Sequence, residues 1–240
     1  MLWMIYRFID RCIDYLDYYY LQGLRRTKKM NELARNIEMD FVLNGNYLLS
    51  ELRNFEIFTH DKVFFEGIKN LVRGKVDNTV ISIFDYRYSF IIYRYGYSGD
   101  FHTSSETRHK IKKDHTIVYF LSELLDLPKF SLHRKGLGDK IANFFTKRDI
   151  QFESNLDFSK YYSLRGENED SIKRVFNKEL LSFEKSIVNK GIRIEGSGNK
   201  LIYYQKKPVK LKDMSSFINS GFQFFEVITM HQLHFDKITI

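Results

Sequence analysis

The chain has 240 residues, of which 43% are hydrophobic and 28% are charged, a balance that fits a folded protein and excludes an intrinsically disordered one. Its formal net charge of +8 weakly favours acidic partners, but residues 1–79 carry 12 basic and 11 acidic side chains, residues 80–150 carry 12 and 8, and residues 151–240 carry 14 and 11. This spread argues against a dedicated nucleic-acid-binding domain, and the single cysteine, Cys12, excludes an intramolecular disulfide and a cysteine-based metal cluster.

Residues 1–20 have the pattern of an amphipathic helix. Outside one charged stripe every side chain is apolar or tyrosine, and the stripe recurs every three or four positions, at Arg7, Asp10, Arg11, Asp14 and Asp17. Each of these charges would cost about 2.5–3.5 kcal/mol at the middle of a bilayer, so the segment is not expected to span one. We expect the helix to pack on its own domain, to pair with a second copy, or to lie in a membrane interface.

The same segment bears on location. No small-residue cleavage site follows the opening apolar run, so no cleavable signal is predicted and we expect a cytoplasmic protein. An interfacial helix would place it at the inner face of the membrane. The three acids on the stripe oppose that location, and the basic linker downstream favours it through its attraction to anionic lipid.

Hydrophobic periodicity and turn residues predict the remaining elements. The first part of the chain is expected to hold a helix over 30–55 broken near 44–46, strands at 55–59 and 63–65, a long strand from residue 80, a polar turn over 96–113, and strands at 115–125 and 129–133. The second part is expected to hold a helix over 136–147, strands at 150–153 and 162–165, a helix over 171–190, strands at 192–195 and 201–205, and a final helix from residue 212 or 213.

This order of elements is typical of an α+β fold, in which helices pack on one face of an antiparallel sheet. Two fused halves of this kind are a second interpretation of the same pattern. The predicted organisation is an amphipathic helix and basic linker over 1–29, a first α+β half over 30–137 and a second over 138–240.

The run over residues 84–97 reads FDYRYSFIIYRYGY and places charges inside the most aromatic strand. Because side chains alternate along a strand, Phe84 and Tyr86 share one face, and Asp85 and Arg87 share the other. We interpret Asp85 and Arg87 as a structural pair on the less buried face, or Asp85 as the partner of a neighbouring backbone group. The sequence offers Asp85 no second ionisable group at a defined distance, which argues against catalysis.

The runs NLVRG, VISIFDYRY, LDLPKFSLHRKG, IQFE, DFSKYYSLRGENE and IEGSGNKLIYYQ together resemble a bacterial family of uncharacterised proteins. The resemblance extends from about residue 55 to residue 225. Members of that family often carry an N-terminal membrane segment ahead of a shared soluble domain, whereas this chain begins with a charged amphipathic helix. The resemblance implies no reaction, ligand or functional residue.

Two basic clusters are the best ligand candidates. They predict anion binding, with solvated surface charge as the alternative, and the second cluster is expected at the tip of a hairpin. The candidate anion-binding residues are Arg25, Arg26, Lys28 and Lys29 in the first cluster, and Arg108, Lys110, Lys112 and Lys113 in the second.

Other chemistries have weaker patterns. His231 and His234 share a helix face but lack a third ligand at a usable spacing, and His102, His109 and His115 are expected on a solvated loop. No GxSxG motif supports acyl transfer, and the GSGN stretch at 196–199 reads as a hairpin turn, because a strand rather than a helix follows it. No catalytic, cofactor-binding or metal-ligating residue is predicted.

The sequence therefore predicts a non-enzymatic module that interacts with a protein or a membrane surface, with its first helix as the docking element and with self-association through that helix as one outcome. The alternative is a nucleic-acid-associated protein that uses the clusters over 25–29 and 108–113. A metal-dependent hydrolase is the least supported alternative, and no cofactor is predicted.

Overall fold

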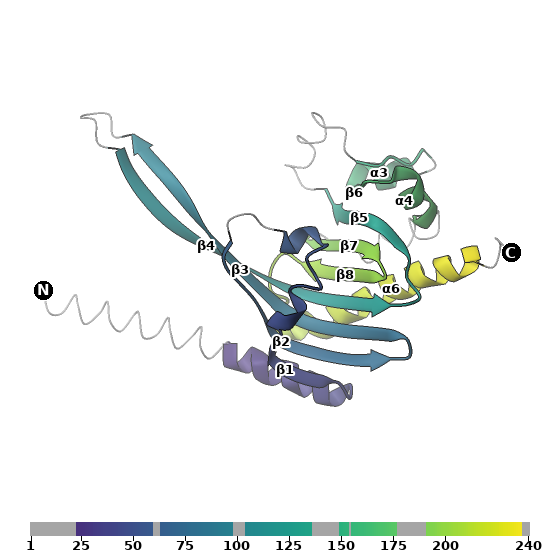
Figure 1. The fold of residues 1–240 in the computed structure, drawn as a ribbon, viewed down its shortest axis with the longest axis horizontal. Coiled ribbons are helices and arrows are strands. Elements are labelled where there is room, and N and C mark those ends of the chain that lie inside the picture. The colour runs from purple at the N-terminus through teal and green to yellow at the C-terminus, as the bar shows by residue number, and fades with distance from the viewer. Residues whose placement is uncertain are drawn as a thin grey trace, which may run out of the picture.

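The computed structural model describes residues 23–59, 63–97, 104–135, 149–153, 155–176 and 191–236. These residues form a mixed α+β fold around one eight-stranded sheet that is antiparallel at every pairing, as the sequence predicted (Figure 1). The strands are β1 (Asp40–Asn44), β2 (Val63–Val76), β3 (Thr79–Tyr97), β4 (Ser104–Ser122), β5 (Leu127–Arg134), β6 (Tyr162–Gly166), β7 (Ile192–Gly198) and β8 (Lys200–Gln205). Their order in the sheet is β1-β2-β3-β4-β8-β7-β5-β6.

Four helices and three single turns of 3-10 helix accompany the sheet in the described residues. They are a helix over 23–36, α3 (Leu156–Tyr161), α4 (Glu169–Val175), α6 (Met214–Asp236), η1 (Asn46–Leu48), η2 (Glu56–Phe58) and η3 (Leu211–Asp213). Asparagine side chains start the two short helices, because Asn155 accepts a hydrogen bond from the backbone N–H of Phe158 and Asn168 accepts one from Ser171.

The sheet crosses the predicted boundary at residue 137. β5 belongs to the predicted first half, yet it lies between β7 and β6 of the second. β4 of the first half likewise pairs with β8 of the second over six residue pairs. Strands from both predicted halves therefore build one continuous sheet.

Both faces of the central strands are buried. Ile81 and Ile83 of β3 join a large cluster that includes Met30, Ala34, Phe217, Phe224 and Ile228 from the helices. Phe84 and Tyr86 alternate with them and join a second cluster, which the segment over 46–58 closes with Leu48, Leu52, Phe55, Ile57 and Phe58. The alternation predicted for β3 is confirmed, but the face of Asp85 is not the less buried one.

Several predicted elements are wrong in detail. The helix predicted over 30–55 ends at residue 36 in the structure, and β1 follows it. The prediction extended the helix too far because the apolar residues of the edge strand DFVLN have helix-like spacing. The segment predicted as a strand over 55–59 contains η2 instead, and the segment predicted as a strand over 150–153 forms no regular strand. The sequence missed α3 and most of β2. The helix predicted over 136–147 and the part of the 171–190 helix beyond residue 176 lie outside the described residues.

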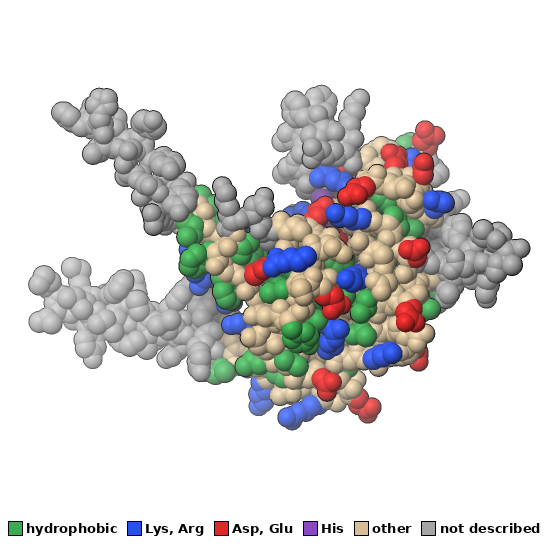
Figure 2. Space-filling model, viewed as in Figure 1, with side chains coloured by type: hydrophobic (Ala, Val, Ile, Leu, Met, Phe, Trp, Pro, Cys, Tyr) green, Lys and Arg blue, Asp and Glu red, His purple; other side chains and the backbone are tan. Residues whose placement is uncertain are grey.

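The β3–β4 hairpin extends past the sheet as a two-stranded ribbon, residues 91–97 and 104–110, which Figure 1 shows as a long arm. β2 pairs with β3 only as far as Phe90, and β8 pairs with β4 only as far as Thr116. The polar turn predicted over 96–113 is therefore wrong, since pairing continues to Tyr97 and Ser104. Hydrophobic side chains gather on the surface beside the base of this arm (Figure 2).

Candidate functional site

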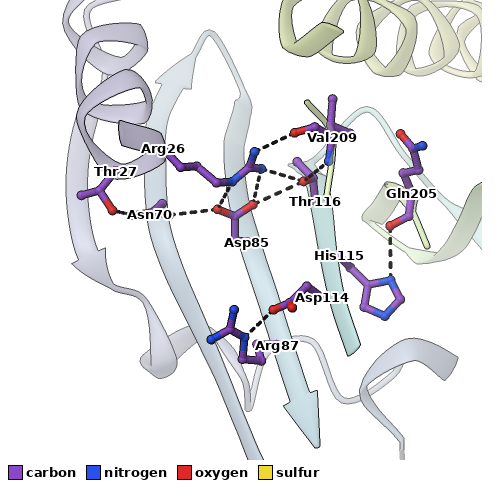
Figure 3. A network of polar contacts seen from close by, with 10 residues as sticks. All are labelled: Arg26, Thr27, Asn70, Asp85, Arg87, Asp114, His115, Thr116, Gln205 and Val209. Carbon is purple, nitrogen blue, oxygen red and sulfur yellow. Dashed lines mark hydrogen bonds and ion pairs between the residues drawn. The ribbon is translucent and has the colours of Figure 1, made fainter. Parts of the chain in front are cut away.

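A network of charged and polar side chains joins the helix over 23–36 to the sheet (Figure 3). Arg26 donates from Nε to Oδ2 of Asp85 at 2.7 Å and from Nη2 to Oδ1 at 2.5 Å, which is a bidentate pair. Nη2 also donates to Oγ1 of Thr116 at 2.8 Å, and the remaining nitrogen, Nη1, donates to the carbonyl of Val209 at 2.6 Å. The Arg26 and Asp85 side chains are only 16% and 18% exposed.

Neighbouring polar groups complete the hydrogen bonding of Asp85. Asn70, which has a positive φ of 54° at a shift in the β2–β3 register, donates to Oδ2 of Asp85 at 2.9 Å and accepts from Oγ1 of Thr27 at 2.7 Å. Thr116 donates to Oδ1 at 3.3 Å and accepts from the backbone N–H of Val209. The carboxylate is thus held by fixed donors, an arrangement suited to fastening a helix rather than to moving a proton.

The predicted Asp85–Arg87 pair is wrong in its partners. Arg26, 59 residues away in sequence, binds Asp85, while Arg87 binds Asp114 of β4 directly across the ladder. The sequence pattern linked Asp85 only to residues near it in the chain, and it placed Arg26 in a predicted anion-binding cluster, with solvated surface charge as the alternative.

The first predicted basic cluster divides between two roles. Arg26 is committed to Asp85, whereas Arg25, Lys28 and Lys29 are exposed on the outer side of the helix. Lys29 forms an exposed ion pair with Glu32 at 2.6 Å. Three of the four cations are thus available at the surface.

The second predicted cluster lies in a strand, not at a hairpin tip. Lys110, Lys112 and Lys113 are exposed residues of β4, opposite Ile91, Ser89 and Tyr88 respectively. Alternation places Lys110 and Lys112 on the face of Asp85, and Lys113 on the other face. The side chain of Arg108 lies outside the described residues. The cluster is therefore split by the strand that carries it.

A second polar site, which the sequence did not indicate, lies around Glu195 of β7. Glu195 is 3% exposed and accepts hydrogen bonds from the hydroxyl of Tyr204 at 2.7 Å and from the backbone N–H of Glu56 at 2.5 Å. The carboxylate of Glu56 accepts from Ser131 at 3.3 Å. Glu195, Glu56 and Ser131 border a cavity of about 160 Å³ between η2 and the strands β5, β6 and β7, which Lys129 and Arg165 also line.

Burial decides the electrostatics of this site. The pKa of Glu195 is raised from 4.5 to about 7, mainly because burial disfavours the charged carboxylate and also because of the charge of Glu56, although the hydrogen bond from Tyr204 acts in the opposite direction. The signal that could have indicated this site is an acid inside the predicted strand over 192–195. Its partners, Tyr204 and Glu56, could not be identified from the sequence. Glu195 and Glu56 offer two carboxylates to one cavity.

Asp149 is also a buried acid, but its pKa is lowered rather than raised. Burial alone would raise the pKa of Asp149, but hydrogen bonds from Arg165, Ser163 and Lys135 outweigh burial and lower it. Ser163 donates to Asp149 at 2.7 Å, and the lowered pKa of Asp149 makes this carboxylate a weak base for activating the hydroxyl.

Metal binding gains no support from the part of the chain that the structure describes. No group of three or more histidine, cysteine or acidic side chains in these residues could hold a metal ion. His109 and His115 lie in β4 rather than on a loop, and His115 is buried with Nδ1 3.2 Å from the carbonyl of Gln205. His102 and the side chains of His231 and His234 lie outside the described residues.

Among the described helices, none combines the length and apolar character needed to cross a membrane.

Comparison with known proteins identifies a fold and no family. No family model matches the chain, and no curated protein matches it. The structure is similar to the crystal structure of the mycobacterial trehalose monomycolate transport factor A, TtfA, with a TM-score of 0.53, 12% sequence identity, and coverage of 84% of this chain and 93% of that one. At that identity the similarity shows the fold alone.

Proposed function

We propose that the chain is a non-enzymatic interaction module that docks on a protein or a membrane surface through its N-terminal segment, at a cytoplasmic location peripheral to the membrane. The observation that carries the proposal is the anchor between Arg26 and Asp85. A bidentate, largely buried ion pair fixes the helix over 23–36 on the sheet. Residues 1–22, which carry the predicted docking helix, lie outside the described residues, and the described chain begins in a helix that is firmly held on the sheet.

The outer side of the same helix supports a docking role. Arg25, Lys28, Lys29 and Arg35 are all exposed at helical spacing, with Glu32 among them. Positive side chains beside an apolar segment favour an anionic surface. We also infer that the helices share one face of the sheet, since the helix over 23–36 and α6 bury residues in the same cluster. The solved structure with this fold is named as a transport factor, which also favours a non-catalytic role.

Removal of residues 1–22 tests the proposal. We expect the truncated protein to stay folded, because the contacts of Arg26 and of the core residues Met30 and Ala34 remain. It should lose sedimentation with membranes and any self-association, measured by pelleting of native extract and by analytical ultracentrifugation. A truncated protein that sediments and associates like the full chain would contradict the docking role.

A full-length variant guards against a truncation that fails to fold. Helical spacing predicts that Ile5, Ile9 and Leu16 lie opposite the charged stripe, so their replacement by serine would remove apolar area and keep every charge. We expect the same loss of binding from this triple variant. Replacement of Asp10 and Asp14 by asparagine is the matched control, and it should not weaken binding.

A further inference from the structure

We propose that the base of the β3–β4 ribbon is a second docking surface, which binds the surface of an anionic lipid bilayer. The surface consists of Phe64, Phe65, Lys110 and Lys112, and we call it the ribbon-base patch. This inference rests on the proposed function and names the partner of the module.

The patch exposes aromatic side chains that a soluble strand would ordinarily bury. Phe64 is 65% exposed and Phe65 is 44% exposed, at the start of β2. The β2–β3 register shifts between Val63 and Phe65, so Phe64 is an extra residue with no partner on β3. Such bulges turn a side chain out of the regular alternation, and here two neighbouring phenylalanines reach the surface.

Two cations lie beside these rings. Nζ of Lys110 lies 4.5 Å from the centroid of the Phe64 ring, within the range of a cation–π contact. Lys112 lies two residues further along the same strand face, opposite Ser89, which pairs with Phe65 on its other side. Within the described part of the chain neither lysine forms an ion pair, and both side chains are exposed.

The chemistry of the patch favours lipid over nucleic acid. Phenylalanine carries no polar group, so insertion of its exposed edge below the headgroups gains burial of apolar area without cost from an unpaired donor. Base stacking needs an open ring face, and the ammonium of Lys110 already covers one face of Phe64. Lysines beside an inserted aromatic ring bind phosphate headgroups, at about 1 kcal/mol for each cation near an anionic surface.

The described N-terminal end of the helix over 23–36 is directed towards the side of the sheet that carries this patch. Arg26 contacts Asp85, while Met30 and Ala34, further along the helix, join the cluster that holds Ile81 and Ile83. The helix therefore runs antiparallel to β3, and its N-terminal end points along β3 towards the ribbon. The same face of β3 and β4 carries Lys112 and Lys110 next in that direction. The N-terminal end of this helix and the ribbon-base patch therefore lie towards the same end of β3.

The test measures how the full chain binds to phosphatidylcholine vesicles with and without phosphatidylserine, by co-sedimentation at low and high salt. The variant Lys110→Gln with Lys112→Gln should weaken binding to the phosphatidylserine vesicles by about tenfold or more, and leave binding to pure phosphatidylcholine unchanged. Phe64→Ser should weaken binding to the phosphatidylserine vesicles severalfold and should leave its salt dependence intact.

Two matched controls come from the same chain. Lys113→Gln removes an exposed cation from the next residue of β4, on the opposite face. Leu156→Ser removes a side chain that is 74% exposed at the start of α3. Both controls should bind vesicles as the unaltered protein does. Equal losses from Lys113→Gln and from the patch variant would overturn the proposal, because general charge and not this face would then be responsible.

The remaining outcomes separate this inference from the proposed function. If the protein without residues 1–22 still binds anionic vesicles and the patch variant abolishes that binding, the docking role of the N-terminal segment is wrong and the patch stands. If the patch variant loses retention on single-stranded DNA or on an acidic protein while vesicle binding is unchanged, the lipid assignment is wrong. Full-length protein that binds neither vesicle overturns the inference.

Discussion

Two ion pairs on one face of β3 show how much the surroundings of a charge determine what it does. Arg26–Asp85 and Arg87–Asp114 involve strand residues only two positions apart. The first pair lies under a helix, with side chains 16% and 18% exposed, and takes part in further hydrogen bonds to Asn70 and Thr116. The second pair lies towards the ribbon, 46% and 33% exposed. The same chemistry fastens a helix at one position and is largely solvated at the other.

The largest effect is expected from breaking the buried pair. Asp85→Ala leaves the guanidinium of Arg26 partly buried without an anion, and such a loss costs about 3 kcal/mol or more of unfolding free energy. Urea denaturation followed by circular dichroism measures it. The helix over 23–36 should also lose protection from amide hydrogen exchange before the strands do, because it loses its main polar contact with the sheet.

A double-mutant cycle sharpens this prediction. Arg26→Met alone should also destabilise, because it leaves the carboxylate of Asp85 without its cation. When Arg26→Met is combined with Asp85→Leu, the loss should be clearly smaller than the sum of the two single losses, since no uncompensated charge remains. Strict additivity would show that the two side chains do not act as a pair.

An intermediate effect is expected from Glu195, a buried acid that accepts hydrogen bonds from two neutral donors, the hydroxyl of Tyr204 and the backbone N–H of Glu56. Its pKa of about 7 in the folded protein exceeds its ordinary value of 4.5. The folded state therefore binds this proton more tightly than the unfolded chain does, so the contribution of Glu195 to stability is fully present below about pH 4.5 and is lost as the pH rises through about 7. The contribution is on the order of 3 kcal/mol at most.

The variant Glu195→Gln isolates that contribution, because the amide reproduces the protonated acid. Unfolding free energies measured at pH 5 and pH 8 should differ less for the variant than for the unaltered protein, by up to that amount. Other groups titrate equally in both proteins and cancel in the comparison. Parallel pH profiles for the two proteins would show that Glu195 remains ionised in the fold.

The sequence predicted those features that depend on residues close together in the chain. Alternation assigned Phe84 and Asp85 to opposite faces of β3, and the glycines over 196–198 predicted the β7–β8 hairpin, where Gly198 has a φ of 56°. The GSGN turn, the final helix and the antiparallel sheet all have local signatures. These features follow from periodicity and backbone preference, which act over a few residues.

The features that it missed depend on contacts between distant residues. Arg26 reaches Asp85 across 59 positions, and the backbone of Glu56 reaches Glu195 across 139. Lys110 and Lys112 alternate along an exposed part of β4, and such a polar stretch resembles a loop in sequence. Lysine is nevertheless common on open strand edges, where it prevents unwanted pairing. Local patterns contain no information on which element lies opposite.

The smallest effect is expected at the exposed pair. Arg87→Ala removes the partner of Asp114, but both side chains are in water, so the loss of unfolding free energy should be below about 1 kcal/mol and should shrink further in high salt. Arg87→Met keeps the aliphatic part of the side chain and should cost less still, which separates packing from charge. Urea denaturation at low and high salt measures both variants. A loss as large as that of Asp85→Ala, insensitive to salt, would mean that this end of β3 is as well shielded from water as the helix junction, and the contrast between the two pairs would then disappear.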